Sequence, residues 1–386
     1  MNTRLETFFA SCPRGLEAVL SRELEALGGH SLAATAGGVE FAGPFELCYR
    51  ANLESRVASR ILWRVASASY RHEQDLYRLA LDQPWETWFA PRCTIKVKVS
   101  AQRCPLKSLD FVTLRIKDAV CDRFARRANL RPSVDTVKPD LRIEAFLDDA
   151  RAILYLDTSG DALFKRGLRK AGSDAPLREN LAAGILSLSG WTPEQPLLDP
   201  MCGGGTILLE AAQIAVQRAP GLDRRFAFEK LRGFEARHWQ RLVEAARARR
   251  TSGRTLAVYG CDKDLRAIRT AQTNLEAAGL AGTVTLAQAD VLDLKPPAET
   301  GILIMNPPYG VRLGQQEELA AFYPQLGDAL KQRFAGWRAY IFSADPRLPK
   351  LIGLAPTRRT PLFNGALECR LFEFKLVSGP ARRRLR

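Results

Sequence analysis

Apolar positions in the first 160 residues repeat with two different periods. Short runs alternate apolar and polar side chains, as a strand with one buried face does. Other stretches place apolar residues three and four positions apart, which is typical of an amphipathic helix. We therefore expect this half to be α+β. The expected strands lie within residues 5–12, 37–43, 94–101 and 140–160 (two strands), and the expected helices within residues 15–27, 45–66 and 109–128.

The pattern changes at about Pro196. Apolar strand-like runs there alternate with helical patterns, which predicts βαβ units and a parallel sheet. These runs lie within residues 196–205, 255–264, 283–293, 301–310 and 337–345. Two final runs, 357–365 and 367–377, are joined by a turn with no helix between them, so we expect an antiparallel hairpin.

The chain is strongly basic, and its charge is unevenly distributed. Its formal net charge is +15 over 386 residues. Residues 1–160 carry 23 basic and 20 acidic side chains, whereas residues 161–386 carry 34 and 22. The excess falls in three clusters, at residues 164–170, 218–254 and 382–386. Arginine-rich helix faces are often merely solvated, but three separate clusters favour a polyanionic partner such as nucleic acid.

The remaining composition is that of an ordinary globular chain, with 46% hydrophobic and 26% charged residues. No apolar stretch approaches the length of a transmembrane helix, and the N-terminus lacks a convincing signal-peptide cleavage region. We therefore expect a cytoplasmic location and no membrane partner. Eight cysteines without a C-x-x-C pair, and only three histidines, predict no metal site and no disulfide framework, with reduced and mostly buried thiols.

Polar residues and glycines follow the apolar runs of the second half, where an open α/β sheet binds its ligands. Asp199 leads into Gly203–Gly205, a turn that allows close backbone approach and precedes a helix N-terminus. The turn is neither a P-loop nor a dinucleotide fingerprint, and alone it is equally consistent with a simple tight turn. Asp262 ends the next run, where it would bind ribose hydroxyls or merely cap a helix. Asp290 ends the third, well placed for an adenine amino group.

The fourth run ends in Asn306-Pro307-Pro308-Tyr309. Together these strand ends resemble the Rossmann-like S-adenosylmethionine-dependent methyltransferases, in the subset that methylates exocyclic or amide nitrogen. In that chemistry the Asn306 side-chain oxygen and the Pro307 carbonyl accept N–H bonds from the amino group, whose lone pair then points at the sulfonium methyl. Pro307 and Pro308 have fixed φ and preorganise the acceptors. Tyr309 offers a face for a flipped or unpaired base.

The resemblance extends over nearly the whole chain. Residues 108–124 ("SLDFVTLRIKDAVCDRF") and 139–167 look like a THUMP RNA-binding domain preceded by a ferredoxin-like domain, and residues 164–191 look like its junction with the catalytic domain. With "DPMCGGGTILLEAA", "NPPYG" and "NGALECRLFEFKL", the chain is similar to the bacterial THUMP-containing guanine-N2 methyltransferases of large-subunit (23S) ribosomal RNA. Some members carry a second methyltransferase domain; an end at Arg386 implies the single form. Gly204 replaces the family's more usual serine and keeps the backbone accessible.

This resemblance implies a fold and a set of binding residues. The fold is a Rossmann-like class I methyltransferase domain, with a mostly parallel seven-stranded sheet and a terminal antiparallel hairpin, after two α+β domains. The implied segments are a ferredoxin-like domain (1–65), a THUMP domain (66–158), a linker (159–174), the methyltransferase domain (175–378) and a basic tail (379–386). S-adenosylmethionine is the implied cofactor, and ribosomal RNA, naked or in an early pre-ribosomal particle, the implied partner. The catalytic residues are Asn306, Pro307, Pro308 and Tyr309, and the cofactor-binding residues are Pro176, Asp199, Pro200, Cys202, Gly203, Gly205, Thr206, Asp262, Asp290 and Asn306.

Other interpretations of the same residues stay open. A tRNA guanine-N2 methyltransferase would share both the RNA-binding half and the site. A DNA adenine-N6 methyltransferase could use the same Asn-Pro-Pro-Tyr turn, but no DNA target-recognition domain is evident. A protein-glutamine methyltransferase shares the turn and has no evident need for so basic a chain. A non-catalytic RNA-binding assembly factor is disfavoured by the intact Asp199, Asp262, Asp290, Asn306 and Tyr309.

Overall fold

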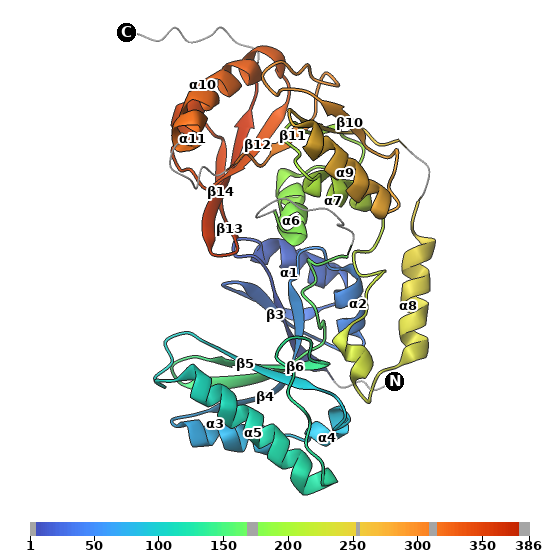
Figure 1. Cartoon of the computed structure of the whole chain (residues 1–386), viewed down its shortest axis with the longest axis vertical. Coiled ribbons are helices and arrows are strands. Elements are labelled where there is room, and N and C mark those ends of the chain that lie inside the picture. The colour runs from blue at the N-terminus through green and yellow to red at the C-terminus, as the bar shows by residue number, and fades with distance from the viewer. Residues whose placement is uncertain (1–4, 168–176, 252–254, 309–314, 378–386) are drawn as a thin grey trace. The chain divides into compact units, whose positions relative to one another are not determined.

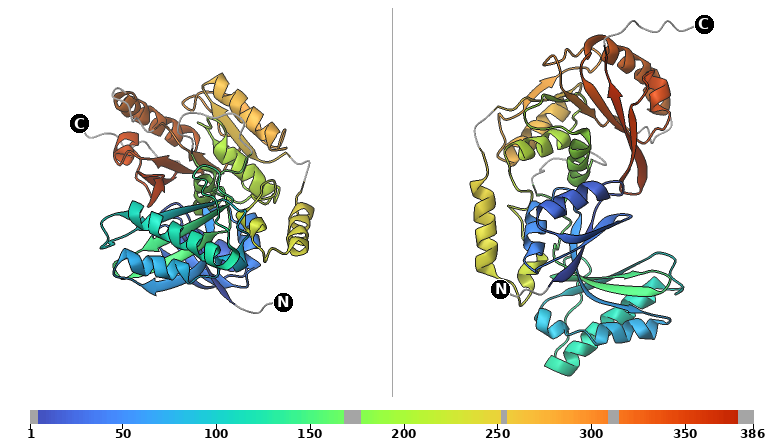
Figure 2. Two further views of the ribbon diagram at one scale, coloured as in Figure 1. Left: turned by 60° about the horizontal axis from the view of Figure 1, so that its bottom comes forward. Right: turned by 180° about the vertical axis from the view of Figure 1, so that it is seen from behind.

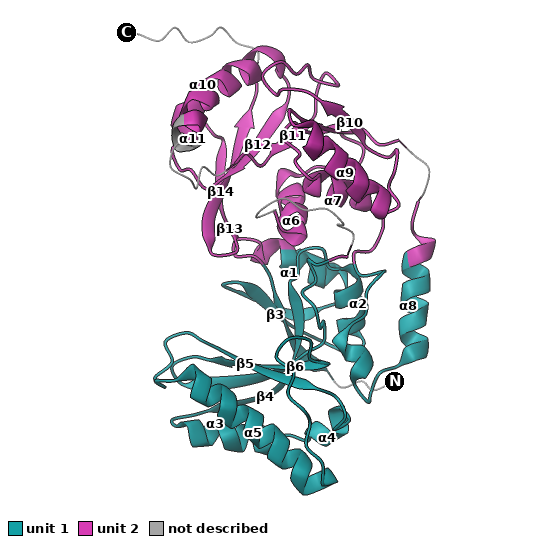
Figure 3. Ribbon diagram, viewed as in Figure 1, with its two compact units in different colours: residues 1–12, 20–165, 221–246 teal, residues 13–19, 166–220, 247–386 magenta. Residues whose placement is uncertain are grey.

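The computed structural model describes residues 5–167, 177–251, 255–308 and 315–377 (Figure 1). The chain forms two compact units that interleave along the sequence (Figure 3). Unit 1 contains residues 1–12, 20–165 and 221–246, and unit 2 contains residues 13–19, 166–220 and 247–386.

Unit 1 is built on one seven-stranded sheet in the order β2-β3-β1-β4-β7-β6-β5. The strands are β1 (Glu6–Ser11), β2 (His30–Thr35), β3 (Gly38–Gly43), β4 (Arg60–Ser69), β5 (Ile95–Ala101), β6 (Leu141–Leu147) and β7 (Arg151–Asp157). All pairs are antiparallel except β5 with β6. Side chains of β6 alternate between buried and half-buried, as its sequence pattern predicts. The boundary expected between residues 65 and 66 falls inside β4, so the sheet is continuous there.

Unit 1 also contains helices. They are α1 (Glu17–Ala26), α2 (Leu47–Glu54), α3 (Glu73–Leu81), α4 (Trp85–Trp88), α5 (Leu109–Ala128), the 3-10 helix η1 (Ala227–Lys230) and α8 (Ala236–Ala248). The α5 helix begins where the Ser108 hydroxyl accepts a hydrogen bond from the Phe111 N–H, and it ends at Asn129, whose φ is positive. Helices α3 and α5 lie side by side on one face of the sheet (Figure 2).

The helix expected over residues 45–66 is wrong in its second half. Helix α2 ends at Glu54, and β4 begins at Arg60 as a strand inside the sheet, between β1 and β7. The Glu23 carboxylate accepts hydrogen bonds from the Ser55 hydroxyl and the backbone N–H groups of residues 56 and 57. These bonds hold extended backbone after the helix. Tertiary pairing of an Ile, Leu, Trp and Val-containing segment therefore overrides its helical spacing.

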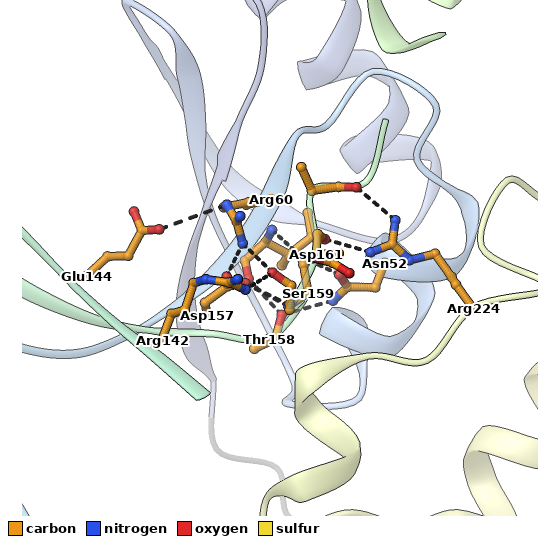
Figure 4. Close-up of polar contacts among 12 residues, drawn as sticks. Asn52, Arg60, Arg142, Glu144, Asp157, Thr158, Ser159, Asp161 and Arg224 are labelled. Carbon is orange, nitrogen blue, oxygen red and sulfur yellow. Dashed lines mark hydrogen bonds and ion pairs between the residues drawn. The ribbon is translucent and has the colours of Figure 1, made fainter. Parts of the chain in front are cut away.

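The first part of the expected linker 159–174 is a fixed part of unit 1 (Figure 4). The Asp157 carboxylate binds Arg60 and accepts a hydrogen bond from the Ser159 N–H, at 2.8 Å. The Ser159 hydroxyl in turn donates to the buried Asn52 side chain at 2.6 Å. Arg224 donates to three carbonyls of the segment, those of residues 161, 162 and 165. Residues 168–174 of that linker, and the tail 379–386, lie outside the described residues.

The basic segment 218–254 is an insertion between two strand-forming runs of the second half, and most of it packs with unit 1. Tyr49 of α2 packs against Phe228 with ring centroids 4.5 Å apart and the rings tilted by 39°, and it also meets Trp239 of α8 edge-on. The Phe228 N–H donates to the Thr158 carbonyl at 3.0 Å. The expected methyltransferase segment 175–378 is therefore not continuous in space, because residues 221–246 leave it.

Unit 2 is a second seven-stranded sheet in the order β10-β9-β8-β11-β12-β14-β13. The strands are β8 (Leu197–Asp199), β9 (Val258–Asp262), β10 (Thr285–Gln288), β11 (Ile302–Met305), β12 (Arg338–Ser343), β13 (Arg358–Asn364) and β14 (Leu367–Lys375). The five strands from β10 to β12 are parallel, and β14 pairs antiparallel with β12 and β13. This is the expected sheet, including its terminal hairpin.

The helices of unit 2 are α6 (Glu179–Ser189), α7 (Thr206–Ala215), α9 (Leu265–Ala277), α10 (Gln315–Arg333) and α11 (Leu348–Ile352). The four residues of β11 are all buried, as befits a strand inside a parallel sheet. Among the described residues, no helix is both long and apolar enough to cross a membrane. All eight cysteines are free thiols, and seven of them are buried.

Candidate active site

The strand order brings the four predicted strand ends to one edge of the unit 2 sheet. From β8 the chain proceeds to β9 and β10 on one side, and later to β11 and β12 on the other. The order therefore reverses between β8 and β11, which pair directly through Ile302 with Leu197 and Leu303 with Leu198. Such a switch point is where open α/β sheets bind ligands, beyond the carboxyl ends of the strands. Asp199 and Asn306 stand on its two sides.

The glycine turn between β8 and α7 is tightly built. Gly203 and Gly205 have φ of +52° and +78°, and the Gly205 N–H donates to the Cys202 carbonyl at 2.8 Å. A Cβ on Gly205 would lie 3.0 Å from that of Ala271, whereas one on Gly203 would meet nothing within 4 Å. Gly205 therefore serves packing of α7 on α9, and Gly203 leaves open space beside the backbone.

Asp262, at the end of β9, holds this turn. Its Oδ2 accepts a hydrogen bond from the Gly203 N–H at 3.0 Å, and its Oδ1 accepts one from the Asp264 N–H at 3.0 Å. The helix-capping role considered for this position belongs to Asp264, whose side chain accepts from the Arg266 N–H. Each Asp262 oxygen still has a lone pair for a ligand. Asp262, which we predict to bind ribose hydroxyls, therefore also stabilises the glycine turn.

Asp199 is a buried carboxyl, with an exposed fraction of 2%. Its Oδ1 accepts a long hydrogen bond from the Met201 N–H at 3.3 Å. Burial raises the pKa of Asp199 to about 8, and the nearby charge of Asp262 acts in the same direction, against the opposing effect of the Met201 bond. A cationic ligand bound beside Asp199 would therefore lower the pKa of this carboxyl and favour its charged form.

The other predicted residues are placed unevenly. Asp290 is exposed after β10, and its Oδ1 accepts a hydrogen bond from the Leu292 N–H at 2.9 Å. Asn306 is half-buried, Pro307 buried and Pro308 exposed directly after β11. Pro200, Cys202 and Thr206 are buried in or beside the glycine turn. Tyr309 and Pro176 lie outside the described residues.

Two polar features near the turn were not predicted. The buried Asn274 of α9 donates from Nδ2 to the Gly204 carbonyl at 3.0 Å, which fixes the middle glycine of the turn. Arg166 and Glu210 of α7 form a fully buried bidentate ion pair, with nitrogen–oxygen distances of 2.6 and 3.1 Å. In the sequence, the only sign of these two interactions is a polar residue on the buried face of a helix. Such a residue does not identify the partner that it binds.

The crevice expected beyond the carboxyl ends of β8, β9 and β11 would suit a cofactor with a cationic sulfonium, an amino-acid end and a nucleoside. Gly203 leaves open space, the buried Asp199 offers a carboxyl that a cationic ligand would ionise, and Asp262 and the exposed Asp290 keep acceptor oxygens. Among the described residues, no group of three or more His, Cys, Asp or Glu could hold a metal ion. Sheet order and site together define a class I, S-adenosylmethionine-dependent methyltransferase.

Comparison with known proteins identifies the family. The family model described as RMKL-like, methyltransferase domain matches residues 166–373, that of the RlmL ferredoxin-like domain matches residues 7–62, and that of the THUMP domain matches residues 70–157. The chain belongs to the RMKL-like methyltransferase family. Members of its class take the methyl group from S-adenosylmethionine, which is therefore the cofactor.

Individual relatives agree along nearly the full chain. It is 44% identical over 379 residues to "Ribosomal RNA large subunit methyltransferase K/L" of Allochromatium vinosum, covering 96% of this chain and 51% of that protein. It is 39% identical over 370 residues to a Synechocystis sp. protein named as an RNA methyltransferase, covering 96% of both. The crystal structure of SMU.472, named as a methyltransferase complexed with SAH, has a TM-score of 0.88 and 30% identity, covering 98% of this chain and 100% of that one. The chain spans about half the length of the K/L proteins that it matches.

Proposed function

We propose that this protein transfers a methyl group from S-adenosylmethionine to the exocyclic N2 of a guanine in large-subunit (23S) ribosomal RNA. The observation that carries the proposal is the Asn306-Pro307-Pro308 segment, which directly follows β11 beside the switch point. The THUMP match and the names of relatives such as the Allochromatium vinosum protein support RNA as the substrate. We take the setting to be the cytoplasm, with naked rRNA or an early pre-ribosomal particle as partner.

The residues of the chain divide the work between binding and orientation. The bound cofactor supplies an electrophilic methyl group. Asp199, Gly203, Asp262 and Asp290 would hold it in the crevice. On the substrate side, the Asn306 side-chain oxygen and the Pro307 carbonyl accept the two N–H groups of the guanine amine. These bonds draw the nitrogen out of conjugation and aim its lone pair. Because φ of Pro307 and Pro308 is fixed, the acceptors need little reorganisation as charge develops.

Substitution of Asn306 tests the mechanism. Asn306→Ala should leave cofactor and RNA affinity nearly intact, because its acceptor matters most as the amine nitrogen pyramidalises. Methyl transfer in single turnover should fall roughly a hundred- to a thousand-fold, the usual cost of one preorganised group. Asn306→Asp keeps an acceptor oxygen at the same place and is the matched control, expected to retain more activity. Thermal melting of each variant checks folding.

The product identifies the substrate. Parent protein with labelled S-adenosylmethionine would be offered 23S rRNA, tRNA, duplex DNA and total protein, and the modified nucleosides or residues identified by mass spectrometry. N2-methylguanine in rRNA alone is expected. Methylation confined to tRNA, to adenine in DNA or to glutamine would replace the proposed substrate, and full activity of Asn306→Ala would overturn the proposed mechanism. No transfer to any of them, with RNA binding retained, would favour a non-catalytic assembly factor.

A further inference from the structure

Helix α8 carries two opposed faces with different chemistry. Its inward face holds Trp239, Leu242, Val243 and Ala246, which are spaced three and four residues apart and are half-buried or buried. Trp239 packs edge-on against Phe226 and Phe228, with centroids 5.5 and 5.1 Å apart. The helix is therefore anchored to unit 1 through its aromatic first half.

The outward face is basic. Arg237 and Arg241 lie one turn apart and are both exposed, with Glu244 as the acidic side chain on the same face. Elsewhere in unit 1, arginines pair closely with carboxylates, as in Arg123 with Glu86 at 2.7 Å and Arg64 with Glu40 at 2.9 Å. Within the described part of the chain, neither Arg237 nor Arg241 forms an ion pair. Arg241 Nη2 lies 3.5 Å from His238 Nδ1, but no carboxylate of the described residues neutralises either guanidinium, so both charges can meet an external anion.

Helix stability does not account for these arginines. The first turn of α8 contains no acidic residue and does contain Arg237, where a cation opposes the positive end of the helix dipole. Alanine would be the better residue at both positions for the helix itself. The surrounding segment 221–250 carries nine basic and four acidic residues, so the local field attracts anions as well.

We propose that Arg237 and Arg241 of α8 bind backbone phosphates of the RNA substrate. This inference rests on the proposed function, because it takes the polyanion to be the rRNA that the enzyme methylates. The insertion between β8 and β9 thereby adds a second RNA-contacting element, separate from the THUMP segment 70–157. Phosphate contacts strengthen binding without reading the sequence.

The double variant Arg237→Ala/Arg241→Ala in the full chain tests this proposal. It should raise the Kd and the KM for a 23S rRNA fragment and lower the magnitude of the slope of log K against log salt by about 2, near 1 per lost phosphate contact. The kcat at saturating RNA and the cofactor Kd should not change. Arg237→Lys/Arg241→Lys should restore the salt slope, and Glu244→Gln should tighten RNA binding by removing a repelling charge.

The outcomes separate this inference from the proposed function. If the parent methylates rRNA and the double alanine variant keeps its Kd and salt slope, the α8 proposal fails while the function stands. If the parent binds rRNA but does not methylate it, the function fails, and the salt slope of the variant still decides the α8 contact. The α8 proposal would also fail if α8 bound an acidic protein and the double alanine variant bound RNA as the parent does.

Discussion

At the scale of single residues, Asp199 couples burial to protonation. Unfolded, its carboxyl ionises near the ordinary aspartate pKa of 3.8, whereas in the folded protein burial raises that pKa to about 8. Between these values the folded state holds a proton that the unfolded state has lost, so this group's contribution to stability falls as pH rises from about 4 to 8. Asp199→Asn, neutral at every pH, should remove that component.

Thermal melting of parent and Asp199→Asn from pH 5 to pH 9 measures this effect. The melting temperature of Asp199→Asn should rise relative to that of the parent as pH increases. S-adenosylmethionine binding to the parent should tighten over the same range, and calorimetry in buffers of different ionisation enthalpy should show proton release. Identical pH profiles for both proteins would mean that Asp199 stays ionised in the fold.

The glycine turn allows a comparison between two neighbouring residues. Gly203→Ala and Gly205→Ala both place a side chain at positive φ, at a cost of about 1–2 kcal/mol each. Only Gly205→Ala adds a close contact, 3.0 Å from Ala271, so its loss of stability should be the larger. Gly203→Ala fills open space and should weaken cofactor binding instead.

Urea unfolding and cofactor calorimetry on both variants separate the two roles. Gly204→Ser, which restores the residue more usual in the family, is the control, because its Cβ would meet Thr270 at an ordinary 3.5 Å. It should change neither stability nor affinity. Cofactor affinity that is untouched in Gly203→Ala would place the ligand elsewhere.

The positions of the polar residues at the strand ends were predictable from the sequence, whereas the hydrogen bonds around them were not. The sequence indicated Asp199, Asp262 and Asn306 because apolar runs end there, and the alternation of strands with helices predicted a parallel sheet that collects those ends. It did not indicate that Asp262 braces Gly203 or that Asn274 binds Gly204. Those bonds join residues 59 and 70 positions apart, and local pattern carries no information on such pairing.

At the scale of elements, the Arg166–Glu210 ion pair joins the segment that leads into α6 to helix α7. Both side chains are buried, with 2% and 0% exposed. Glu210→Leu leaves a buried guanidinium without this carboxylate and should destabilise the protein by about 3–5 kcal/mol. The double variant Arg166→Met/Glu210→Leu removes both charges and should recover most of that loss.

A double-mutant cycle by urea denaturation tests the pair, with Arg166→Met as the fourth corner. Lys331, which pairs with the exposed Asp328 on the surface, gives the control: Asp328→Ala should cost less than about 1 kcal/mol. Additive effects of the two single substitutions at Arg166 and Glu210 would show that the ion pair is energetically unimportant.

Elements were predicted well where length and period agreed and poorly where they conflicted. Helix α5 was expected over the residues that it occupies, because twenty amphipathic positions follow a serine cap. Residues 60–66 keep a helical spacing and still form β4, because both neighbouring strands require a partner there. The position of a strand in a sheet is a tertiary property that a short window does not contain.

At the scale of the whole molecule, the order of the sequence differs from the grouping in space. Residues 221–246 leave the methyltransferase segment to pack on unit 1, where they cover Tyr49 with Phe228 and Trp239. A division of the sequence into consecutive domains does not reveal this packing, because the residues that flank an insertion do not indicate which part of the protein it contacts. A fragment of residues 1–165 therefore lacks part of its own core.

We expect the fragment 1–165 to be much less stable than a version joined to residues 221–246 by a Gly/Ser linker. Phe228 is fully buried, and losing one such aromatic side chain typically costs about 3–5 kcal/mol, or roughly 6–20 °C in melting midpoint for a unit of this size. Circular dichroism melts and dye binding to exposed apolar surface compare the two. The joined version with Phe228→Ala and Trp239→Ala is the matched control, and its melting midpoint should be close to that of the fragment. Equal melting of fragment and joined version would show that residues 1–165 complete their core without the insertion.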